Sequence, residues 1–238
     1  MSRTVVITQS NYIPWRGYFD MLRLADQVVL LDSVQYTRRD WRNRNKIKTP
    51  QGASWLSISV EVKGRYNESI DQIRIADMTW AQNHRRAISL AYRRAPHFGA
   101  QGQWVDDLLA RVAYETRLTD VNETLIRAIC EKLKIGTSIC RCTDLLSLET
   151  MAGMDPSERL AALAERAGAT RYISGPAAKA YLDHEAFNKR GIEVGWMDYS
   201  GYPPYPQLWG DFEPAVSILD LILNTGDDAT HYLEKTIS

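Results

Sequence analysis

The sequence predicts an α/β fold, a Rossmann-like and mainly parallel sheet with flanking helices. Short runs rich in Val, Ile and Leu alternate with stretches of helical periodicity, which is the pattern of α/β domains. Residues 4–9 and 27–32 are two such runs, and a helical stretch over 18–25 lies between them as a βαβ unit. A chain of 238 residues can build one full core. We therefore expect a single α/β domain over residues 1–238, with a helical subdomain at about 79–134.

The N-terminal elements follow from residue type and spacing. Residues 4–9 (TVVITQ) and 27–32 (QVVLLD) are expected to be buried strands, because apolar residues run through them without alternation. Residues 54–60 alternate polar and apolar side chains, which is typical of a strand with one solvated face. Residues 69–75 are a candidate partner for that strand.

The middle of the chain is predicted to be helical. Helices are expected over residues 79–94, 104–114 and 119–134. In the third of these, apolar side chains recur at helical spacing and form one stripe that should face the core. The members of this stripe are Val121, Leu125, Ala128, Ile129 and Leu133.

The C-terminal part returns to alternating strands and helices. The tetrapeptide from Asp155 to Glu158 (DPSE) predicts a helix start, because Asp is a favoured N-cap, Pro suits the first helical position and Glu the third. Another helix is expected over 215–223, where the sequence Asn-Thr-Gly at 224–226 ends it. Further strands are expected at 138–142, 171–174 and 193–199.

Composition excludes several classes of protein. The chain has 29 basic and 29 acidic residues, so no whole-protein charge draws it onto nucleic acid or anionic lipid. Three cysteines, of which Cys130 is expected in the core, are too few for a secreted disulfide framework. Cys140 and Cys142 have no second pair, so we expect no metal site. No run approaches the ~18 apolar residues of a membrane span, and the first apolar run is too short for a signal peptide, which favours a cytoplasmic protein.

The first segment that could bind a ligand is 9–18 (QSNYIPWRGY), directly after the first strand. Open α/β sheets bind ligands beyond the carboxyl ends of their strands. Polar groups and flat aromatic surfaces are dense in this segment, so we expect ligand contact. The alternative is that the aromatic rings belong to the core and that Pro14 and Gly17 only make turns. The candidate binding residues are Gln9, Asn11, Tyr12, Trp15 and Tyr18.

The second candidate segment, 32–48, is a loop after the second strand and is strongly basic. Between residues 36 and 48, six basic side chains stand against one acidic side chain. Arg forks bind phosphate through two hydrogen bonds, and Tyr36 and Trp41 could stack on a base or sugar. The alternative is a solvated charged face, which would favour scattered Lys and Glu. The candidate substrate- or phosphate-binding residues are Gln35, Tyr36, Arg42, Asn43, Arg44 and Lys46.

Two carboxylates follow predicted strands. Asp32 ends the second strand and is the strongest candidate for a general base or an amine anchor, although it could simply cap a turn. Asp198, after the last strand, is the second candidate. It also opens an acidic stretch, 198–238, in which seven Asp or Glu residues stand against one Lys. This stretch balances the basic segment and could lie opposite it.

The third candidate segment is 172–181 (YISGPAAKAY), which predicts a strand, a turn of small residues and a helix. Ser174 and the N–H groups at that helix start could bind a phosphate or carboxylate, with Lys179 nearby in the sequence. Alternatively, Ser174 is only an N-cap. The four histidines fall in no ligand or triad spacing, and the chain contains no P-loop, G-x-S-x-G or G-x-G-x-x-G motif.

Four segments of the sequence resemble the WbqC-like protein family: QSNYIPWRGYFD, LDSVQYTRRDWRNRNKI, ISGPAAKAYLD and MDYSGYPPYPQLWGDFEPAVSILDLILNTG. The resemblance is collinear and runs from Gln9 to Gly226. The family is known mainly from bacterial gene clusters for O-antigen and other surface glycans, and its proposed role is transfer of glycine to an amino sugar. The resemblance therefore implies a glycine transferase of lipopolysaccharide synthesis. It supplies no established catalytic residues to carry over.

A more distant similarity concerns the fold. The strand, the segment from Pro14 to Tyr18, the helix and the next strand are laid out like the H-x-G-H region of nucleotidylyltransferase-like α/β domains. That superfamily includes ligases that form an acyl-adenylate and pass the acyl group to an amine, so the similarity implies chemistry suited to glycine transfer. Here Trp15 and Tyr18 stand where the two histidines would be.

Together these observations favour an acyl-transfer enzyme that acts on a nucleotide-linked amino sugar. Basic side chains would hold the diphosphate, rings would pack on the base or sugar, and Asp32 would accept the proton of the attacking amine. Two alternatives stay open: a nucleic-acid or charged-tRNA binder that uses residues 38–48, and a catalytically silent scaffold of a glycan-assembly complex. The sequence leaves open whether ATP or a charged tRNA supplies the activated acyl group, and the oligomeric state.

Overall fold

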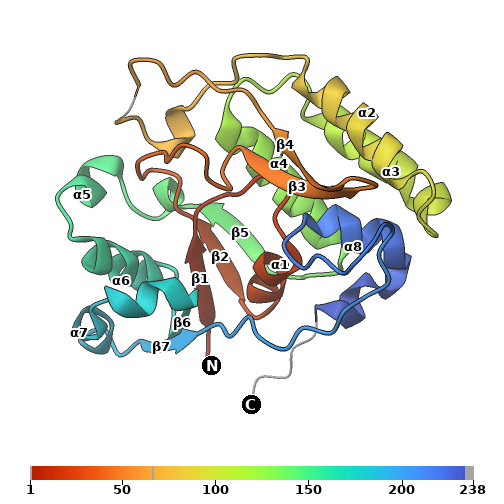
Figure 1. Cartoon of the computed structure of the whole chain (residues 1–238). Helices are drawn as coiled ribbons and strands as arrows, with labels where there is room; N and C mark the ends of the chain where they lie inside the picture. Colours follow the sequence, from red (N-terminus) through yellow and green to blue (C-terminus); the bar gives the residue numbers. More distant parts are fainter. Residues whose placement is uncertain (1, 66, 234–238) are drawn as a thin grey trace. The chain divides into compact units, whose positions relative to one another are not determined.

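The computed structural model describes residues 2–65 and 67–233, and the chain in it forms two compact units (Figure 1). The sheet unit contains the chain up to Gln9, Met21–Ser33 and Ile135–Ser200. The hairpin unit contains Ser10–Asp20, Val34–Lys134 and the chain from Gly201 onward. Helix α1 (Arg16–Arg23) spans one boundary between these stretches. A single domain over residues 1–238 stays a prediction.

The sheet unit is built on five parallel strands. They are β1 (Thr4–Thr8), β2 (Gln27–Leu30), β5 (Ser138–Arg141), β6 (Arg171–Ser174) and β7 (Glu193–Trp196). Their order is β5-β2-β1-β6-β7, and every neighbouring pair is parallel. The central strand is β1, in which Val6 pairs with Val28 on one side and with Ile173 on the other. The predicted Rossmann-like sheet is therefore confirmed.

Short helices accompany these strands. Helix α6 (Pro156–Arg166) packs against β1, and α7 (His184–Asn188) packs against β7. As the sequence predicts, Asp155 caps α6, because its side chain accepts a hydrogen bond of 2.8 Å from the backbone N–H of Ser157. The five-residue helices α5 (Leu148–Ala152) and α7 were not predicted, since so short a helix shows no periodic stripe. Two 3₁₀ turns lie at Cys142–Asp144 and Pro176–Ala180.

The hairpin unit combines an antiparallel pair of strands with helices. The strands are β3 (Arg44–Thr49) and β4 (Gly52–Ser57). The helices are α2 (Trp80–Tyr92), α3 (Phe98–Arg111), α4 (Leu118–Lys132) and α8 (Ile218–Thr225), with 3₁₀ turns at Ile70–Gln72 and Gly226–Tyr232. Helix α3 contacts α2, α4 and α8, and α8 also contacts β3. The three predicted helices of the middle segment are confirmed, although α3 begins at Phe98 and not at residue 104.

Strand β3 is the main element that the sequence analysis missed, because it placed residues 44–49 in a basic loop. The structure shows a period of two: Asn45 and Ile47 are buried, whereas Arg44 and Lys46 are partly exposed. Asn at the inward position hides the apolar alternation by which such a strand is recognised. Arg44 and Lys46 of the charged run therefore belong to one face of a hairpin.

Residues 69–75, proposed as a strand partner, contain the 3₁₀ turn at Ile70–Gln72 and form isolated bridges in place of a strand. Of these bridges, the one between Val60 and Ile75 joins the segment to the predicted strand at 54–60. The apolar side chains of residues 69–75 are buried, which explains the strand-like pattern. Helix α8 begins at Ile218, later than predicted, because the Ser217 side chain accepts from the N–H of Leu219 and caps it.

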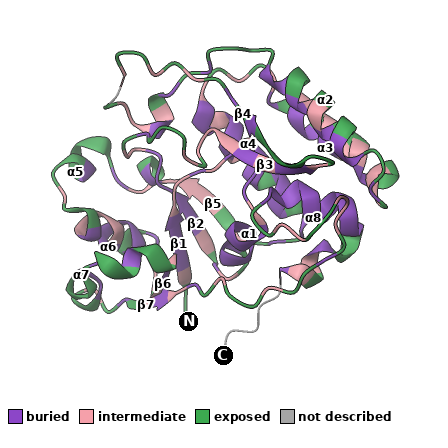
Figure 2. Cartoon of the chain, in the orientation of Figure 1, coloured by how far each residue is buried: buried purple, intermediate pink, exposed green. Residues whose placement is uncertain are grey.

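The core follows the predicted helix stripe. All five residues of the α4 stripe are buried, and Figure 2 shows β1 and β2 of the sheet unit largely purple. Cys130 is buried as predicted, and burial raises the pKa of its thiol to about 12, so the thiol is neutral. Within residues 2–65 and 67–233, no helix has both the length and the apolar character needed to cross a bilayer.

Candidate functional site

In the sheet unit, four of the predicted site residues follow the carboxyl ends of strands. Gln9 comes directly after β1, and Ser174 is the last residue of the neighbouring strand β6. Asp32 follows β2 and Asp198 follows β7. The chain adds strands first on one side of β1 and then on the other, so β1 and β6 meet at a topological switch point. Such a point is where open α/β sheets bind ligands.

The polar groups at this edge differ in exposure. Asp32 is 4% exposed and is the sheltered carboxylate of the set. Asp198 is exposed and accepts hydrogen bonds from the backbone N–H (2.9 Å) and the hydroxyl (3.0 Å) of Ser200, so it holds the following turn. Ser174 is buried. Lys179 is exposed.

In the hairpin unit, Arg42 is held by its neighbours. Its guanidinium donates a hydrogen bond to Asn11 Oδ1, and its Nη2 lies 3.7 Å from Asp40 Oδ2. Asp40 also accepts from the hydroxyl of Thr37 at 2.6 Å and from the backbone N–H of Trp41 at 2.7 Å. Burial raises the pKa of Asp40, but these hydrogen bonds and Arg42 outweigh it and leave the pKa below its ordinary value. Asp40 and Arg42 therefore fix the loop before β3.

Exposed rings and cations gather on one face of the β3–β4 hairpin. Lys46 pairs directly with Trp55 across the two strands, so both side chains project from the same face. The guanidinium carbon of Arg44 lies 4.1 Å from the centre of the Trp55 ring, and Nζ of Lys46 lies 5.2 Å from it. The ring centres of Trp41 and Trp55 are 5.5 Å apart, and these residues are 43% and 42% exposed. We call Trp41, Arg44, Lys46 and Trp55 the hairpin face.

The opposite face of the hairpin holds a strained turn. Nδ2 of Asn45 donates to the backbone oxygens of Tyr12 (3.2 Å) and Ile13 (2.7 Å). Ile13 has φ of +38°, a conformation that a β-branched residue rarely adopts. The backbone N–H of Tyr12 donates to the carbonyl of Trp41 at 3.0 Å. Hydrogen bonds to and from the backbone of Tyr12 and Ile13 therefore hold the segment after β1 against the basic loop and β3.

Three tyrosines predicted to contact a ligand have buried rings: Tyr12, Tyr18 and Tyr36. The hydroxyl of Tyr12 lies 2.7 Å from Nδ1 of His84, inside the hairpin unit. Burial lowers the pKa of His84 to about 4, although a hydrogen bond with the backbone of Ser57 raises it, so the imidazole is neutral at pH 7. Tyr12 and Tyr18 belong to the core, which is the alternative that the sequence left open for the first segment. Tyr36, from the second segment, is buried as well.

Two asparagine side chains make further hydrogen bonds to the basic loop and the residues around it. Asn43 donates to the carbonyl of Ile58 at 2.8 Å, and its own Oδ1 is buried without a hydrogen-bond partner among the described residues. Asn122, which the sequence analysis missed, donates to Ser10 Oγ (3.2 Å) and to the carbonyl of Arg42 (2.9 Å). A polar residue beside the apolar stripe of α4 is the signal that could have identified Asn122. Gln35 is exposed.

Arg16 is a second residue that sequence reasoning missed. It follows Trp15, begins α1 and is 4% exposed, with aromatic rings of the C-terminal segment around it. Trp15 packs over Gly17, where an added methyl group would overlap the indole. The signal in the sequence is an Arg within a segment whose other bulky side chains are aromatic or apolar.

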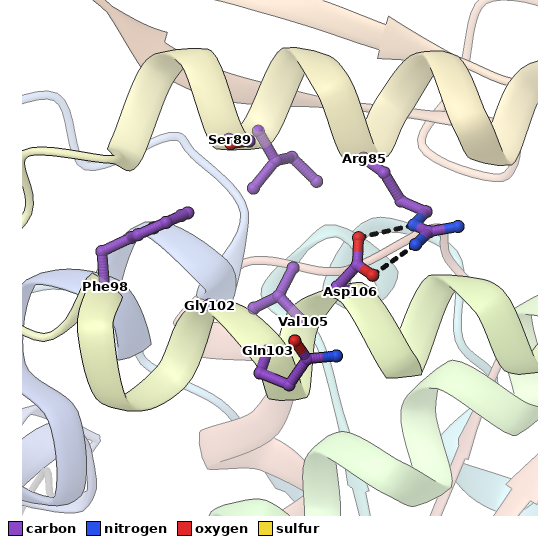
Figure 3. A pocket seen from close by; sticks show the side chains of 8 residues that line it. Arg85, Ser89, Phe98, Gly102, Gln103, Val105 and Asp106 are labelled. Carbon is purple, nitrogen blue, oxygen red and sulfur yellow. Dashed lines mark hydrogen bonds and ion pairs between the residues drawn. The ribbon is translucent and has the colours of Figure 1, made fainter.

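Cavities occur in both units, away from the predicted residues. One of about 220 Å³ lies between α2 and α3 (Figure 3). At its rim, Arg85 donates two hydrogen bonds to Asp106 and thereby lowers the pKa of that carboxyl. A second, of about 620 Å³, is in the sheet unit and is lined by Asp155, Pro156, Ser157, Tyr181 and Asp183. The described residues contain no group of three or more His, Cys, Asp or Glu side chains arranged to hold a metal ion.

Comparison with known proteins extends over nearly the whole chain. The family model described as WbqC-like protein family matches residues 9–232. The chain is also 46% identical over 231 residues to the uncharacterized protein Rv1507c of Mycobacterium tuberculosis, and the alignment covers 97% of each chain. No solved structure matches the chain.

Proposed function

The chain belongs to the WbqC-like protein family, and from this premise we propose that it is an acyl transferase that moves a glycyl group onto a nucleotide-linked amino sugar. The proposed setting is the cytoplasmic part of bacterial surface polysaccharide synthesis, such as that of O-antigen and lipopolysaccharide. The observation that carries the proposal is the hairpin face, which presents cations and flat rings together.

The cations of the hairpin face suit a diphosphate. A guanidinium stacked on a ring keeps its N–H groups in its own plane, where they can meet two phosphate oxygens. Arg44 lies in this way over Trp55, and Lys46 adds a compact charge beside the same ring. Nη2 of Arg44 donates to the backbone carbonyl of Arg39, which is a neutral acceptor. Among the described residues, neither cation has a carboxylate within 4.0 Å, so no ion pair neutralises their charge.

The rings of the hairpin face suit a base or sugar. Two indoles, each about two-fifths exposed, lie 5.5 Å apart. Stacking of a base on an exposed aromatic side chain contributes about 1–3 kcal/mol per base. Trp41 and Trp55 are therefore the proposed stacking surfaces, a role the sequence analysis gave to Trp41.

Acyl transfer to an amine forms a C–N bond and breaks the bond between the acyl carbon and its donor. One possible donor is a glycyl-adenylate, which forms from glycine and ATP with release of pyrophosphate and whose leaving group is AMP. The other is the glycyl ester of a tRNA, whose leaving group is the free tRNA. The amine must lose a proton to a base as it reacts. Asp32 is the proposed acceptor because it is a sheltered carboxylate at the carboxyl edge of the parallel sheet, and Asp198 is the second candidate. Gln9, Ser174 and Lys179 are proposed to bind polar groups of the substrates.

The test is to incubate the purified chain with a UDP- or dTDP-linked amino sugar and a glycyl donor, and to measure the product mass. One arm supplies glycine and ATP, and the other supplies glycyl-tRNA. Addition of one glycyl group in either arm, and its loss in the Asp32→Asn variant, is the expected result. Absence of product in both arms, with several amino sugars, contradicts the proposal.

Variants of the hairpin face test the binding step separately. Arg44→Gln and Trp55→Ala should each weaken binding of the nucleotide-sugar by roughly tenfold, because each removes a charge-assisted or stacking contact. Arg94→Gln removes the same charge from an exposed position at the end of α2 and is the matched control. If wild type and the three variants bind the nucleotide-sugar with equal affinity, the hairpin face is not part of the binding site.

A second candidate function is favoured by the same two indoles. Single-stranded nucleic acids bind where aromatic rings alternate with basic side chains, and the acceptor end of a tRNA is such a strand. This function predicts affinity for tRNA that falls steeply with salt concentration and needs Trp41 and Trp55. Salt-independent binding of the nucleotide-sugar, without binding of tRNA, excludes it.

A further inference from the structure

Arg16 is a charged side chain enclosed by the hairpin unit. The guanidinium carbon lies 4.8 Å from the centre of the Tyr202 ring, 5.4 Å from that of Tyr205 and 5.7 Å from that of Phe212. Arg16 is 4% exposed. A guanidinium stays protonated in proteins, so this is a positive charge removed from water.

The charge has no anionic partner. Among the described residues, Arg16 makes one hydrogen bond, from Nη1 to the carbonyl oxygen of Pro203 at 2.7 Å. Its Nε is buried and has no acceptor within the described chain. A carbonyl is a neutral acceptor and compensates a buried charge weakly, because removing an ion from water costs several kcal/mol.

Two buried carboxylates lie close to the ring system but serve the tyrosines. Asp20 accepts from the hydroxyl of Tyr202 at 2.7 Å, and Asp220 accepts from the hydroxyl of Tyr205 at 2.8 Å. Among the described residues, the contacts of Arg16 are the Pro203 carbonyl and the aromatic rings, and they include no ion pair within 4.0 Å. The two tyrosine rings beside Arg16 are thus held by their hydroxyl groups, while the guanidinium makes no ion pair of its own.

Electrostatics agree with this geometry. Burial lowers the pKa of Arg16, against the hydroxyl groups of Tyr205 and Tyr202, which raise it. A buried cation whose partner is missing is destabilising unless a ligand supplies the opposite charge.

We infer that Arg16 is an oxyanion-binding residue, whose ligand is a phosphate or carboxylate group that takes the place of the Pro203 carbonyl and also bonds to Nε. The fork of an Arg matches two oxygens of either group. Binding is possible because the segment that carries Tyr202 and Pro203 has no regular secondary structure and its Pro203 is exposed. The inference does not depend on acyl transfer, since it concerns only anion binding by the hairpin unit.

The test compares wild type, Arg16→Met and Arg16→Lys by calorimetric titration with inorganic phosphate and, separately, with acetate. Each protein is also measured in an Arg44→Gln background, which removes phosphate binding by the hairpin-face arginine. We expect wild type to bind one of the anions roughly tenfold more tightly than either variant, because both lack the fork. A preference for phosphate assigns the site to a phosphorylated substrate, and a preference for acetate assigns it to a carboxylate.

Thermal unfolding without added anion gives the second readout. If Arg16 awaits an anion, Arg16→Met should unfold at the same or a higher temperature, because an uncompensated charge is removed. If Arg16 only stabilises the packing of the aromatic rings, the Arg16→Met variant should unfold at a lower temperature and its anion affinity should equal that of wild type. That second pattern, or equal affinity of all three proteins for both anions, overturns the inference. Failure of the transfer reaction leaves these binding results unaffected.

Discussion

Two arginines of the hairpin unit lie against aromatic rings and differ in how much water reaches them. Arg44 covers one face of Trp55, which is 42% exposed, whereas Arg16 is enclosed by Tyr202, Tyr205 and Phe212 at 4% exposure. An exposed cation–π contact contributes about 0.5–1 kcal/mol, and a desolvated one about 2 kcal/mol or more. Burial of the charge costs several kcal/mol in return. Arg44 can thus exchange its contact with Trp55 for a ligand at little cost. The position of Arg16 depends instead on the groups that hold the surrounding aromatic rings.

The largest effect is expected where those ring-holding groups are removed. Asp220 is fully buried and accepts hydrogen bonds from the hydroxyls of Tyr92 (2.7 Å) and Tyr205 (2.8 Å) and from Nε2 of Gln207 (2.8 Å). Asp220→Ala leaves the buried hydroxyls of Tyr92 and Tyr205 without this acceptor, whereas Nε2 of Gln207 keeps the carbonyl of Glu213. The substitution should lower the free energy of unfolding by about 3–5 kcal/mol. Urea titration measures the loss.

Asp220→Asn is the matched control, since it keeps one carbonyl oxygen in a side chain of the same shape. Asp220→Asn should lower the free energy of unfolding by about half as much as Asp220→Ala does. If Asp220→Ala is as stable as wild type, the rings around Arg16 are not held by this carboxylate and the comparison with the hairpin face fails.

The next effect concerns the helix start that carries Arg16. Gly17→Ala places a methyl group inside the indole of Trp15, whose ring also lies 6.0 Å from that of Tyr202. Displacing Trp15 should lower the free energy of unfolding by about 1–3 kcal/mol. Gly99→Ala, at a position of α3 where nothing lies within 4 Å of the added methyl, should leave stability nearly unchanged. Chemical denaturation of both variants decides the matter.

The pH dependence of stability tests the buried side of the hairpin. His84 has a folded pKa of about 4, below the ordinary 6.5, so the unfolded chain takes up a proton first. The contribution of the neutral, buried His84 to the free energy of unfolding is fully present above pH 6.5 and is lost as the pH falls toward 4. Between pH 7 and pH 5 the free energy of unfolding should fall by about 2 kcal/mol from this group. His84→Asn should remove that part of the pH dependence in urea titrations, and an unchanged slope would contradict it.

The smallest effect on stability is expected at the hairpin face. Trp55→Ala removes an indole that water already reaches, together with its contacts to Arg44 and Lys46. The free energy of unfolding should change by less than about 1 kcal/mol, although ligand affinity should fall. A loss comparable to that of Asp220→Ala would show that the hairpin face is part of the core and not a binding surface.

Much of the fold could be predicted because its signals are local. Strands β1 and β2 lie in continuous apolar runs, and the Asp155 cap and the α4 stripe depend on residues close together in the sequence. Strand β3 was missed because Asn45, its inward polar residue, is satisfied by backbone oxygens of Tyr12 and Ile13, more than thirty residues earlier. A pattern of neighbouring residues in the sequence cannot indicate a contact over that separation.

The candidate site was predictable by residue type but not by exposure. Basic and aromatic residues are visible in the sequence, yet Tyr12 and Tyr36 are buried while Trp55, taken only as a strand residue, is exposed beside Arg44. Arg16 escaped notice because its partners, Tyr202 and Tyr205, lie almost two hundred residues further along the chain. Tertiary packing decides which side of an aromatic residue meets solvent.

The hairpin unit also constrains how the protein can be made. Its three stretches are interrupted by the sheet unit, and the buried ammonium of Lys48 is bonded to Gln207 and to the backbone of Asp211, 163 positions later. A ribosome that has released only the first half of the chain has therefore exposed a strand whose lysine still lacks its acceptors. This unit must close after translation is nearly complete, and no contiguous fragment of the gene encodes it.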